Sequence, residues 1–378
     1  KFGEHWTKSL RDLAVEAGLR AIEDAGIYAK DIDAIYGGNM SAGSSIYQDS
    51  LGPLIADFTG LAINKIPALR IENGSASGSA ALHEGYLAVA SGLYDTVLVG
   101  GVEKLTDVSS EEITDVLAGA ADREWEVFNG ATLPALAALM ARRYMYEYNA
   151  KREQIAMMPV LSHKHGSLNP YAHFRNTIKV EDVLNATMVS EPLTMLDCAP
   201  ISDGAAALVL TTLENAKKLG KDKIVKISAS SVASDYLALH NRESLTRMDS
   251  TIFAARKAYR QAKIEPNKIN IVELHDAFSI FGLIALEDLG FVEKGKAGMM
   301  LEEGIGNLDS KIAINPSGGL KAKGHPVGAT GIGQVVEAVL QLRGEAEKRQ
   351  VNNAEYALTH SVAGSGASSI VHILEVVR

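Results

Sequence analysis

The stretch from Asn315 to Gly331, which reads NPSGGLKAKGHPVGATG, holds the residues with the clearest chemical use. Its glycines are Gly318, Gly319, Gly324, Gly328 and Gly331, and they surround His325. An apolar run, Ile312–Ile314, precedes the stretch, and apolar residues at helical spacing follow it, so the order is strand, loop and helix. Glycines let the backbone approach a ligand, helix starts offer free N–H groups, and a histidine there can move protons near neutral pH. For a lone Gly-His-Pro, an ordinary tight connection with a surface histidine is the alternative.

The bulk composition describes an ordinary globular protein of 378 residues, 47% hydrophobic and 22% charged, with two or three domains. A net charge of −9 without a basic block argues against nucleic acid, although a local pocket would still accept an anionic ligand. No apolar run reaches the roughly 18–20 residues of a membrane span, and no signal peptide is visible. One cysteine, Cys198, excludes an internal disulfide framework. We therefore expect a cytoplasmic enzyme.

An internal repeat organises the elements that must position these residues. A helix ending at Gly26 and a strand, IDAIYGG, follow the N-terminus. A shift of 237 residues, from Ala21 to Ala258, places this helix, loop and strand over AKIEPNKINIVEL. The small-residue turns ENGSASGSAAL and GHPVGATG each open a helix and form a second correspondence. Two similar halves that alternate strand and helix predict an α/β fold with helices packed across mixed sheets.

The segment from about Ser109 to Glu191 interrupts the first half. It is rich in methionine and aromatic residues and has little strand pattern, so we expect an inserted, mostly helical excursion. The predicted domains are residues 1–220, with the excursion at about 109–191, and residues 221–378. A charged, helix-like linker, LENAKKLGKDK, joins the halves.

The motifs GHPVGATG, HDAF, SDGAAA and ASG, within this duplicated pattern, closely resemble those of thiolases, which make or cleave 3-oxoacyl-CoA. The histidines His275 and His360 resemble the sterol-carrier type found in archaea and bacteria. The resemblance implies a five-layered αβαβα fold whose inserted loop domain covers the CoA pocket. It also implies a strand before Phe2-Gly3, which this sequence does not contain.

The resemblance places a serine where the family has its nucleophilic cysteine. In thiolases a cysteine precedes Ala-Ser-Gly at the start of a buried helix, and here that position is Ser75. A hydroxyl is far less acidic than a thiol, so we expect weak or no turnover. On propensity alone, Ser75 would also serve as an ordinary helix N-cap.

The remaining site residues follow from the same resemblance. His325 is implied as the base for Ser75, His275 as a ligand of the thioester oxygen, and His360 as the group that moves the second proton. As alternatives, His275 is a strand-end histidine and the C-terminal glycines only shape a turn. The backbone N–H groups of the oxyanion site are assigned to Val362 and Gly364. The acyl-CoA pocket is assigned to Ala277, Phe278 and Gly318.

Two further features are weak candidates for a nucleophile and for a metal site. Cys198 lies in LDCAPISDGAA, a segment that is structural in the family. His163 and His165 stand one residue apart without nearby cysteines or carboxylates, so no metal is predicted. The glycine patterns lack the dinucleotide fingerprint, so NAD is not supported. The resemblance implies coenzyme A as a substrate and no permanently bound cofactor.

Three functional readings stay open. The first is an acetyl-CoA acetyltransferase carrying a replaced cysteine. The second is a degenerate thiolase that binds CoA or acts as a scaffold, and the third is a thiolase-fold aldolase. The resemblance also implies a role in lipid metabolism through the mevalonate pathway. Together with small, apolar stretches such as SGSAALHEGYLAVASG and YDTVLVGG, which would suit burial at a two-fold interface, it implies a homodimer or dimer of dimers. It further implies a complex with hydroxymethylglutaryl-CoA synthase and a zinc-ribbon/OB-fold protein.

Overall fold

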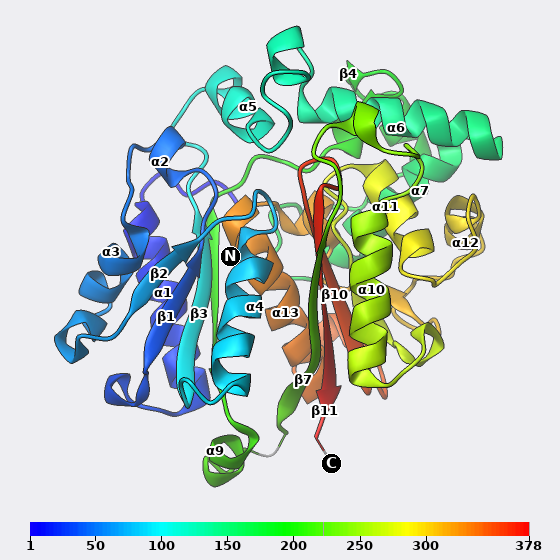
Figure 1. Cartoon of the computed structure of the whole chain (residues 1–378). Coiled ribbons are helices and arrows are strands. Elements are labelled where there is room, and N and C mark those ends of the chain that lie inside the picture. Colours follow the sequence, from blue (N-terminus) through cyan, green and yellow to red (C-terminus); the bar gives the residue numbers. More distant parts are fainter. Residues whose placement is uncertain (222, 378) are drawn as a thin grey trace.

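The computed structural model describes residues 1–221 and 223–377 and contains two large sheets (Figure 1). The first sheet has the order β2 (Ala68–Ile71), β1 (Ala34–Gly38), β3 (Thr96–Glu103) and β6 (Gly204–Thr211). The second has the order β7 (Val225–Ser234), β11 (Ser368–Val376), β10 (Tyr356–Ala363), β8 (Ile271–Glu273) and β9 (Ala313–Ile314). In the first sheet the pairs β2–β1 and β1–β3 are parallel and β3–β6 is antiparallel. In the second sheet the pairs β7–β11 and β11–β10 are antiparallel, whereas β10–β8 and β8–β9 are parallel.

Helices fill the space between the sheets and cover their outer faces. The central layer consists of α4 (Ser77–Ala90) and α13 (Val327–Arg343), which contact each other and strands of both sheets. The outer layers consist of α1 (Leu10–Ala25) and α3 (Leu51–Phe58) on one side, and α10 (Asp249–Ala262) with α11 (Ser279–Asp288) on the other. The predicted five-layered αβαβα fold is therefore confirmed (Figure 1).

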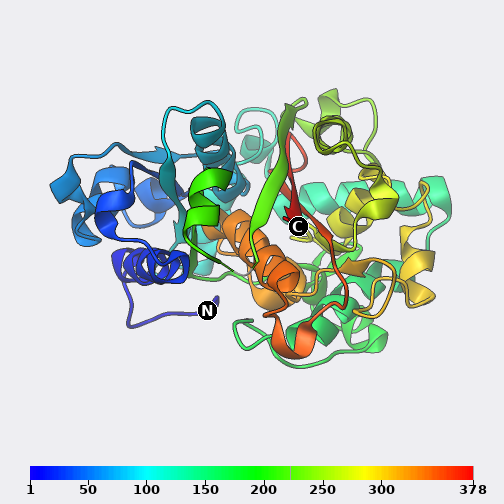
Figure 2. The same ribbon diagram turned by 90° about the horizontal axis from the view of Figure 1, so that it is seen from below.

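The duplication predicted from the sequence is present in the elements. Helix α1 ends at Ala25 and α10 ends at Ala262, while β1 begins at Ala34 and β8 begins at Ile271, and both differences are 237 residues. Helices α4 and α13, which follow the two small-residue turns, share the central layer. Seen from below, α13 runs between the two halves (Figure 2).

The excursion connects β3 to β6, two neighbouring antiparallel strands, and lies over one end of both sheets (Figure 1). It comprises α5 (Ser110–Ala118), α6 (Leu133–Tyr148), α7 (Arg152–Gly166), α8 (Val180–Leu184), and the hairpin β4 (Met188–Ser190) and β5 (Leu193–Thr194). The remaining helices are α2 (Ala42–Ser45), α9 (Leu213–Lys218) and α12 (Ala297–Glu302). Asp222 of the predicted linker and Arg378 lie outside the described residues, and the domain boundaries stay a prediction.

One expectation needs correction, and a second stays untested. The glycine-rich stretch is only partly loop, because Gly319–Lys323 form a π-helical turn and α13 already begins at Val327. The apolar stretches expected at a two-fold interface form α4 and β3, of which β3 is an inner strand of its sheet and α4 lies between the sheets. Their small residues permit close packing inside one subunit, and the dimer stays a prediction.

The edge strand β6 borders a groove with a volume of about 500 Å³, lined by α1, β6, β7 and α13. None of the residues assigned to the active site is among those that line it. Within residues 1–221 and 223–377, no helix has the length and apolar character needed to cross a bilayer.

A buried carboxylate fixes the start of α13 against the first sheet. Glu103 ends β3 and is fully buried, and its Oε2 accepts the backbone N–H groups of Gly328 and Met40 at 3.0 Å each. Its Oε1 accepts the side-chain amide of Asn39 at 2.8 Å and both the backbone N–H (3.0 Å) and the hydroxyl (2.6 Å) of Ser41. Burial raises the pKa of Glu103, and these donated hydrogen bonds counter that rise.

We predict that Glu103→Ala lowers the free energy of unfolding by about 3 kcal/mol or more, because several buried donors would lose their acceptor. Urea titrations followed by circular dichroism measure this loss. Glu23→Ala, which removes an exposed carboxylate from α1, is the control and should change stability by less than about 0.5 kcal/mol. Equal changes in the free energy of unfolding for the two substitutions would show that the hydrogen bonds of Glu103 make no net contribution to stability.

Candidate active site

Ser75 lies in the tight turn between β2 and α4, two residues before the helix begins. Gly74 takes a positive φ of 51° there, and Ser77 closes the turn by donating its hydroxyl to the carbonyl of Gly74 at 2.6 Å. The side chain of Ser75 is 7% exposed, and its hydroxyl donates to the carbonyl of Val362 at 2.8 Å. Ser75 is therefore a buried hydroxyl at a helix start that contacts β10 of the other half.

His325 stands between the π-helical turn and α13. Its Nδ1 contacts the hydroxyl of Thr330 at 2.8 Å, and its backbone N–H donates to the hydroxyl of Ser202 at 3.3 Å. With Nδ1 engaged inside the protein, Nε2 is the ring nitrogen left for a reacting group. Desolvation lowers the pKa of His325 to about 3, although the residue keeps a partly exposed edge, so the ring is neutral at pH 7.

His275 follows β8 and meets His325 edge-on, with ring centroids 5.1 Å apart and planes at 90°. It is 1% exposed, and its Nδ1 has no hydrogen-bond partner among the described residues. Burial lowers the pKa of His275 well below its usual value, and positive charge on His325 or His360 would lower it further. Three neutral histidines thus come together from three segments distant in the sequence.

His360 lies in the middle of β10 and is fully buried. Its Nε2 contacts the hydroxyl of Thr251, in the first turn of α10, at 3.0 Å. Its Nδ1 has no partner within the described part of the chain, and burial lowers its pKa to about 3. The imidazole is therefore an uncharged group with one nitrogen engaged and one free.

Gln334 of α13 ties the segments of the site together. Its side-chain N–H group donates to the carbonyls of Leu274 and His360 at 3.0 and 3.1 Å, and its carbonyl accepts the hydroxyl of Ser361 at 2.8 Å. Ser79 of α4 in turn donates to the hydroxyl of Ser361 at 2.7 Å. One glutamine therefore links both central helices to β10 and to the loop of His275. Sequence reasoning missed it because a single polar residue in an apolar helix leaves its partners unidentified.

Two buried carboxylates hold the glycine-rich segment against β8. Glu273 accepts the backbone N–H and the hydroxyl of Ser317 at 2.9 and 2.6 Å, and Asp276 accepts the backbone N–H of Leu320 at 2.7 Å. Desolvation raises the pKa of Asp276 to about 6, and it also raises that of Glu273, where the nearby Lys323 opposes the rise. These contacts fix the loop from which His325 extends.

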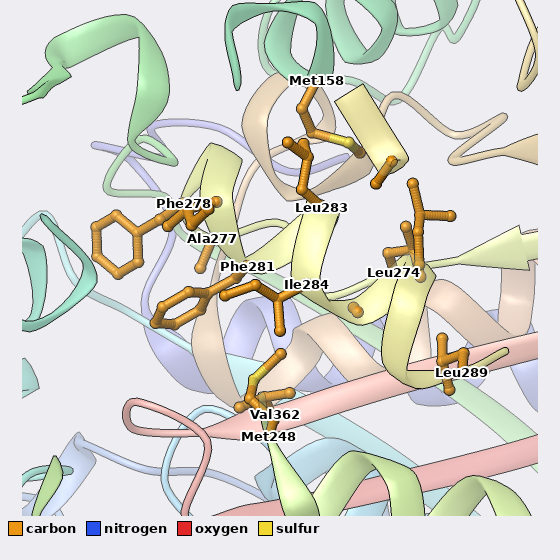
Figure 3. Close-up of a cluster of buried hydrophobic side chains, with 14 of the residues drawn as sticks. Met158, Met248, Leu274, Ala277, Phe278, Phe281, Leu283, Ile284, Leu289 and Val362 are labelled. Atoms are coloured by element: carbon orange, nitrogen blue, oxygen red, sulfur yellow. The ribbon is translucent and has the colours of Figure 1, made fainter. Parts of the chain in front are cut away.

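An apolar cluster fixes the other side of the HDAF loop. Phe278 and Phe281 meet edge to face with centroids 5.1 Å apart, below Met158 of α7 and above Val362 of β10 (Figure 3). Ala277 and Phe278 are 8% and 9% exposed, so both keep a small accessible surface. The backbone carbonyl of Ala277 accepts the N–H of Ala199 at 2.8 Å. Their assignment to the acyl pocket stays a prediction.

The two backbone donors and Gly318 have other contacts. Val362 belongs to β10 rather than to the turn, and it meets Ser75 through its carbonyl, which has the opposite polarity to the expected donor. Gly364 has a φ of 58°, and a Cβ there would come within 2.3 Å of the carbonyl of Ala120. Gly318 packs on α7, where a Cβ would lie 2.7 Å from the Cα of Gly166. The assignment of Gly364 as an oxyanion donor stays a prediction.

The weak candidates occupy structural positions. The thiol of Cys198 contacts the carbonyl of Thr194 at 3.5 Å, and desolvation raises the pKa of that thiol to about 12, which keeps it protonated. His163 and His165 contact backbone carbonyls through Nδ1. No group of three or more potential metal ligands occurs within the described residues.

Comparison with known proteins agrees with this arrangement. Residues 1–214 match the thiolase N-terminal domain, and residues 231–376 match the thiolase C-terminal domain-like family. The chain belongs to the thiolase family. It is 53% identical over 373 residues to the acetyl-CoA acetyltransferase of Methanothermobacter thermautotrophicus, covering 99% of this chain and 96% of that one.

Other thiolase-like relatives are more distant. Human sterol carrier protein 2 is 33% identical, over 97% of this chain and 68% of its own length, in line with the predicted sterol-carrier resemblance. A solved structure titled Ltp2-ChsH2(DUF35) aldolase superposes with a TM-score of 0.84 at 27% identity, covering 98% of this chain and 94% of that one. The fold is thus shared by proteins named for different reactions.

We predict that the free energy of unfolding falls as the pH drops below about 6.5, because the neutral buried histidines gain protons more readily when unfolded. His372 is a test outside the proposed site: it is fully buried, and desolvation lowers its pKa to about 3 from 6.5. Its lowered folded pKa adds stability above 6.5 that is lost as the pH falls towards about 3. His372→Gln should flatten the pH slope between pH 6.5 and 5 by up to about 1.4 kcal/mol per unit.

Denaturant unfolding at a series of pH values measures that slope. His240→Gln, which alters an exposed histidine, is the control and should keep the wild-type slope. Parallel slopes for wild type and His372→Gln would contradict the prediction.

Proposed function

We propose that this thiolase-family protein is an acyl-CoA acyltransferase of the acetyl-CoA C-acetyltransferase type, with little or no activity because Ser75 takes the place of the nucleophilic cysteine. The observation that carries the proposal is that Ser75, just before α4, donates to Val362 of β10, the strand that also holds His360. His275 and His325 meet edge-on, and burial keeps all three histidines neutral. The relative from Methanothermobacter supports the reaction class. Acetyl-CoA and acetoacetyl-CoA are the proposed substrates, without a permanent cofactor.

In the proposed reaction, His325 accepts the proton of the group at position 75 as that group attacks the thioester carbonyl. The carbon–sulfur bond breaks, and CoA leaves as the thiol with the proton from His325. His275 and the N–H of Gly364 hold the oxyanion. His360 moves the proton at the α-carbon of the second acyl group during condensation, or returns it during thiolysis. In the resting site the Ser75 hydroxyl is bound to the Val362 carbonyl, which supports the proposed weak turnover.

The second candidate function is that of a thiolase-fold aldolase, or of a CoA-binding scaffold. It is supported by the similarity to the structure titled Ltp2-ChsH2(DUF35) aldolase and by the serine, rather than a cysteine, at position 75. The aldolase's title also names a DUF35 chain. We therefore propose that this chain assembles with an accessory protein, such as a zinc-ribbon/OB-fold protein, and with hydroxymethylglutaryl-CoA synthase. Co-purification from the native host tests this assembly. A cytoplasmic location and a place in the mevalonate pathway complete the proposal.

We predict that Ser75→Cys raises the rate of acetoacetyl-CoA thiolysis on the order of 10³-fold or more, because a thiol supplies a better nucleophile and leaving group. Initial rates with acetoacetyl-CoA and CoA measure it. Ser91→Cys, which puts a thiol at the far end of the same helix, is the matched control and should match wild type. Adding His360→Ala to Ser75→Cys should abolish thiolysis.

Two outcomes would decide against parts of this proposal. If Ser75→Cys accepts an acetyl group but never completes thiolysis, the protein is degenerate beyond Ser75 and the scaffold function is favoured. If Ser75→Cys behaves like Ser91→Cys and accepts no acetyl group, the assignment of the nucleophile position is wrong.

We also propose a homodimer formed through β2. This strand is an edge of the first sheet, and Leu69 within it is 52% exposed, so a second copy would cover both. Leu69→Asp should shift sedimentation from dimer to monomer at micromolar concentration. Leu139→Asp, at a leucine of α6 that is 53% exposed, should not. A monomeric wild-type protein would rule the dimer out.

A further inference from the structure

A row of buried hydroxyl groups connects His360 to a backbone carbonyl. His360 Nε2 lies 3.0 Å from Thr251 Oγ1, which lies 2.8 Å from Ser369 Oγ. Ser369 Oγ lies 2.7 Å from Ser250 Oγ, and Ser250 Oγ lies 2.7 Å from the carbonyl oxygen of Gly366. His360, Thr251, Ser369 and Ser250 are all fully buried.

The carbonyl at the end of the row sets the direction of every bond in it. A carbonyl oxygen only accepts hydrogen bonds, so Ser250 must donate its single hydroxyl proton to the carbonyl of Gly366. Ser250 then accepts from Ser369, and Ser369 in turn accepts from Thr251, because each hydroxyl has one proton to donate. Thr251 has no proton left for His360. The ring nitrogen Nε2 must therefore carry a proton and donate it to Thr251.

We propose that Ser250, Ser369 and Thr251 are positioning residues that hold His360 in the Nε2–H tautomer and leave Nδ1 as an unprotonated lone pair. This accounts for the buried Nδ1 that has no partner among the described residues. Because burial keeps the ring neutral at pH 7, one tautomer must be chosen, and the row of hydroxyls makes that choice.

The turn that supplies the terminal carbonyl is itself fixed. Arg242, 8% exposed, donates to the carbonyl of Ser365 at 2.6 Å and to its hydroxyl at 3.1 Å. Gly366 takes a φ of 112°, and a Cβ there would lie 3.0 Å from Arg242. The acceptor for Ser250 is thus held in place by a buried guanidinium rather than by a mobile loop.

For catalysis the tautomer decides which nitrogen acts as the base, and this part rests on the proposed function. During condensation a C–H bond at the α-carbon of the acyl group breaks, its electron pair forms the enolate, and the proton goes to His360 Nδ1. The resulting imidazolium keeps its Nε2–H bond to Thr251. The proton returns from Nδ1 when the reaction runs in the direction of thiolysis. No further reactant is needed.

Neutron diffraction from deuterium-exchanged crystals of the wild-type protein tests the tautomer directly. We expect deuterium on His360 Nε2 and none on Nδ1. Nitrogen NMR of histidine-labelled protein gives the same readout in solution, with His360→Gln identifying the resonances. Thr251→Val should then populate both tautomers, whereas Thr251→Ser, which keeps the hydroxyl, should restore the single wild-type signature.

Thr359→Val is the matched control, because Thr359 is equally buried and its hydroxyl has no partner in the part of the chain that the structure describes. It should keep the wild-type tautomer. If Thr251→Val does not fold, Ser369→Ala interrupts the same row. Deuterium on Nδ1 in the wild type, or an unchanged tautomer in Thr251→Val, would overturn the proposal. An inactive Ser75→Cys with the expected tautomer would instead refute the proposed function alone.

Discussion

The site depends on the close approach of two helix starts. Gly78, near the N-terminus of α4, lies so close to α13 that a Cβ would stand 2.5 Å from the carbonyl of Gly328. A Cβ at Gly101 of β3 would stand only 2.1 Å from the same carbonyl. A side chain at Gly78 would push α4 and α13 apart, and a side chain at Gly101 would push α13 away from β3. Either change would move the turn that carries Ser75 or the helix that follows His325. The small residues of the two turns are therefore a packing requirement of the central layer.

Buried carboxylates hold in place the close packing that the glycines allow. Glu103 binds the first turn of α13 to the first sheet, while Glu273 and Asp276 bind the preceding glycine-rich segment to the second sheet. Each carboxylate accepts at least one backbone N–H group, which ties it directly to the main chain of the segment that it holds. The histidines between these anchors are held away from water and stay neutral, which suits groups that must accept a proton.

The sequence predicts the frame of the fold well, because the frame follows local patterns that occur twice. The period of Ala21 and Ala258 reveals two equivalent halves, and the motifs around His275, His325 and His360 identify the loops that meet. The sequence alone does not reveal the role of Glu103, an acidic residue at the end of an apolar strand. That role depends on its hydrogen bond with Gly328, which lies 225 residues away in the sequence. The one indication in the sequence is that an acidic residue ends the apolar run TVLVGGVE, because a carboxylate at the end of a buried strand needs hydrogen-bond donors from elsewhere in the protein.

Local composition does not decide which neighbour a residue packs against. Small apolar residues in α4 and β3 suit an interface between subunits as well as one between layers, and the tertiary contacts show that they pack between layers here. Val362 was assigned as a donor because glycines follow it, but the strand continues past it and its carbonyl faces Ser75. The sequence does not identify the role of hydroxyl groups such as that of Thr251, because its partner His360 lies more than a hundred residues away in the sequence.

The central claim is that position 75 is where this fold would bind an acyl group covalently. Peptide mapping by mass spectrometry after incubation of Ser75→Cys with acetyl-CoA tests it most directly. We expect the acetyl group on the peptide that contains position 75, and its loss when His325→Ala is added. An acetyl group found on Cys198 instead, or on no peptide, would contradict the account.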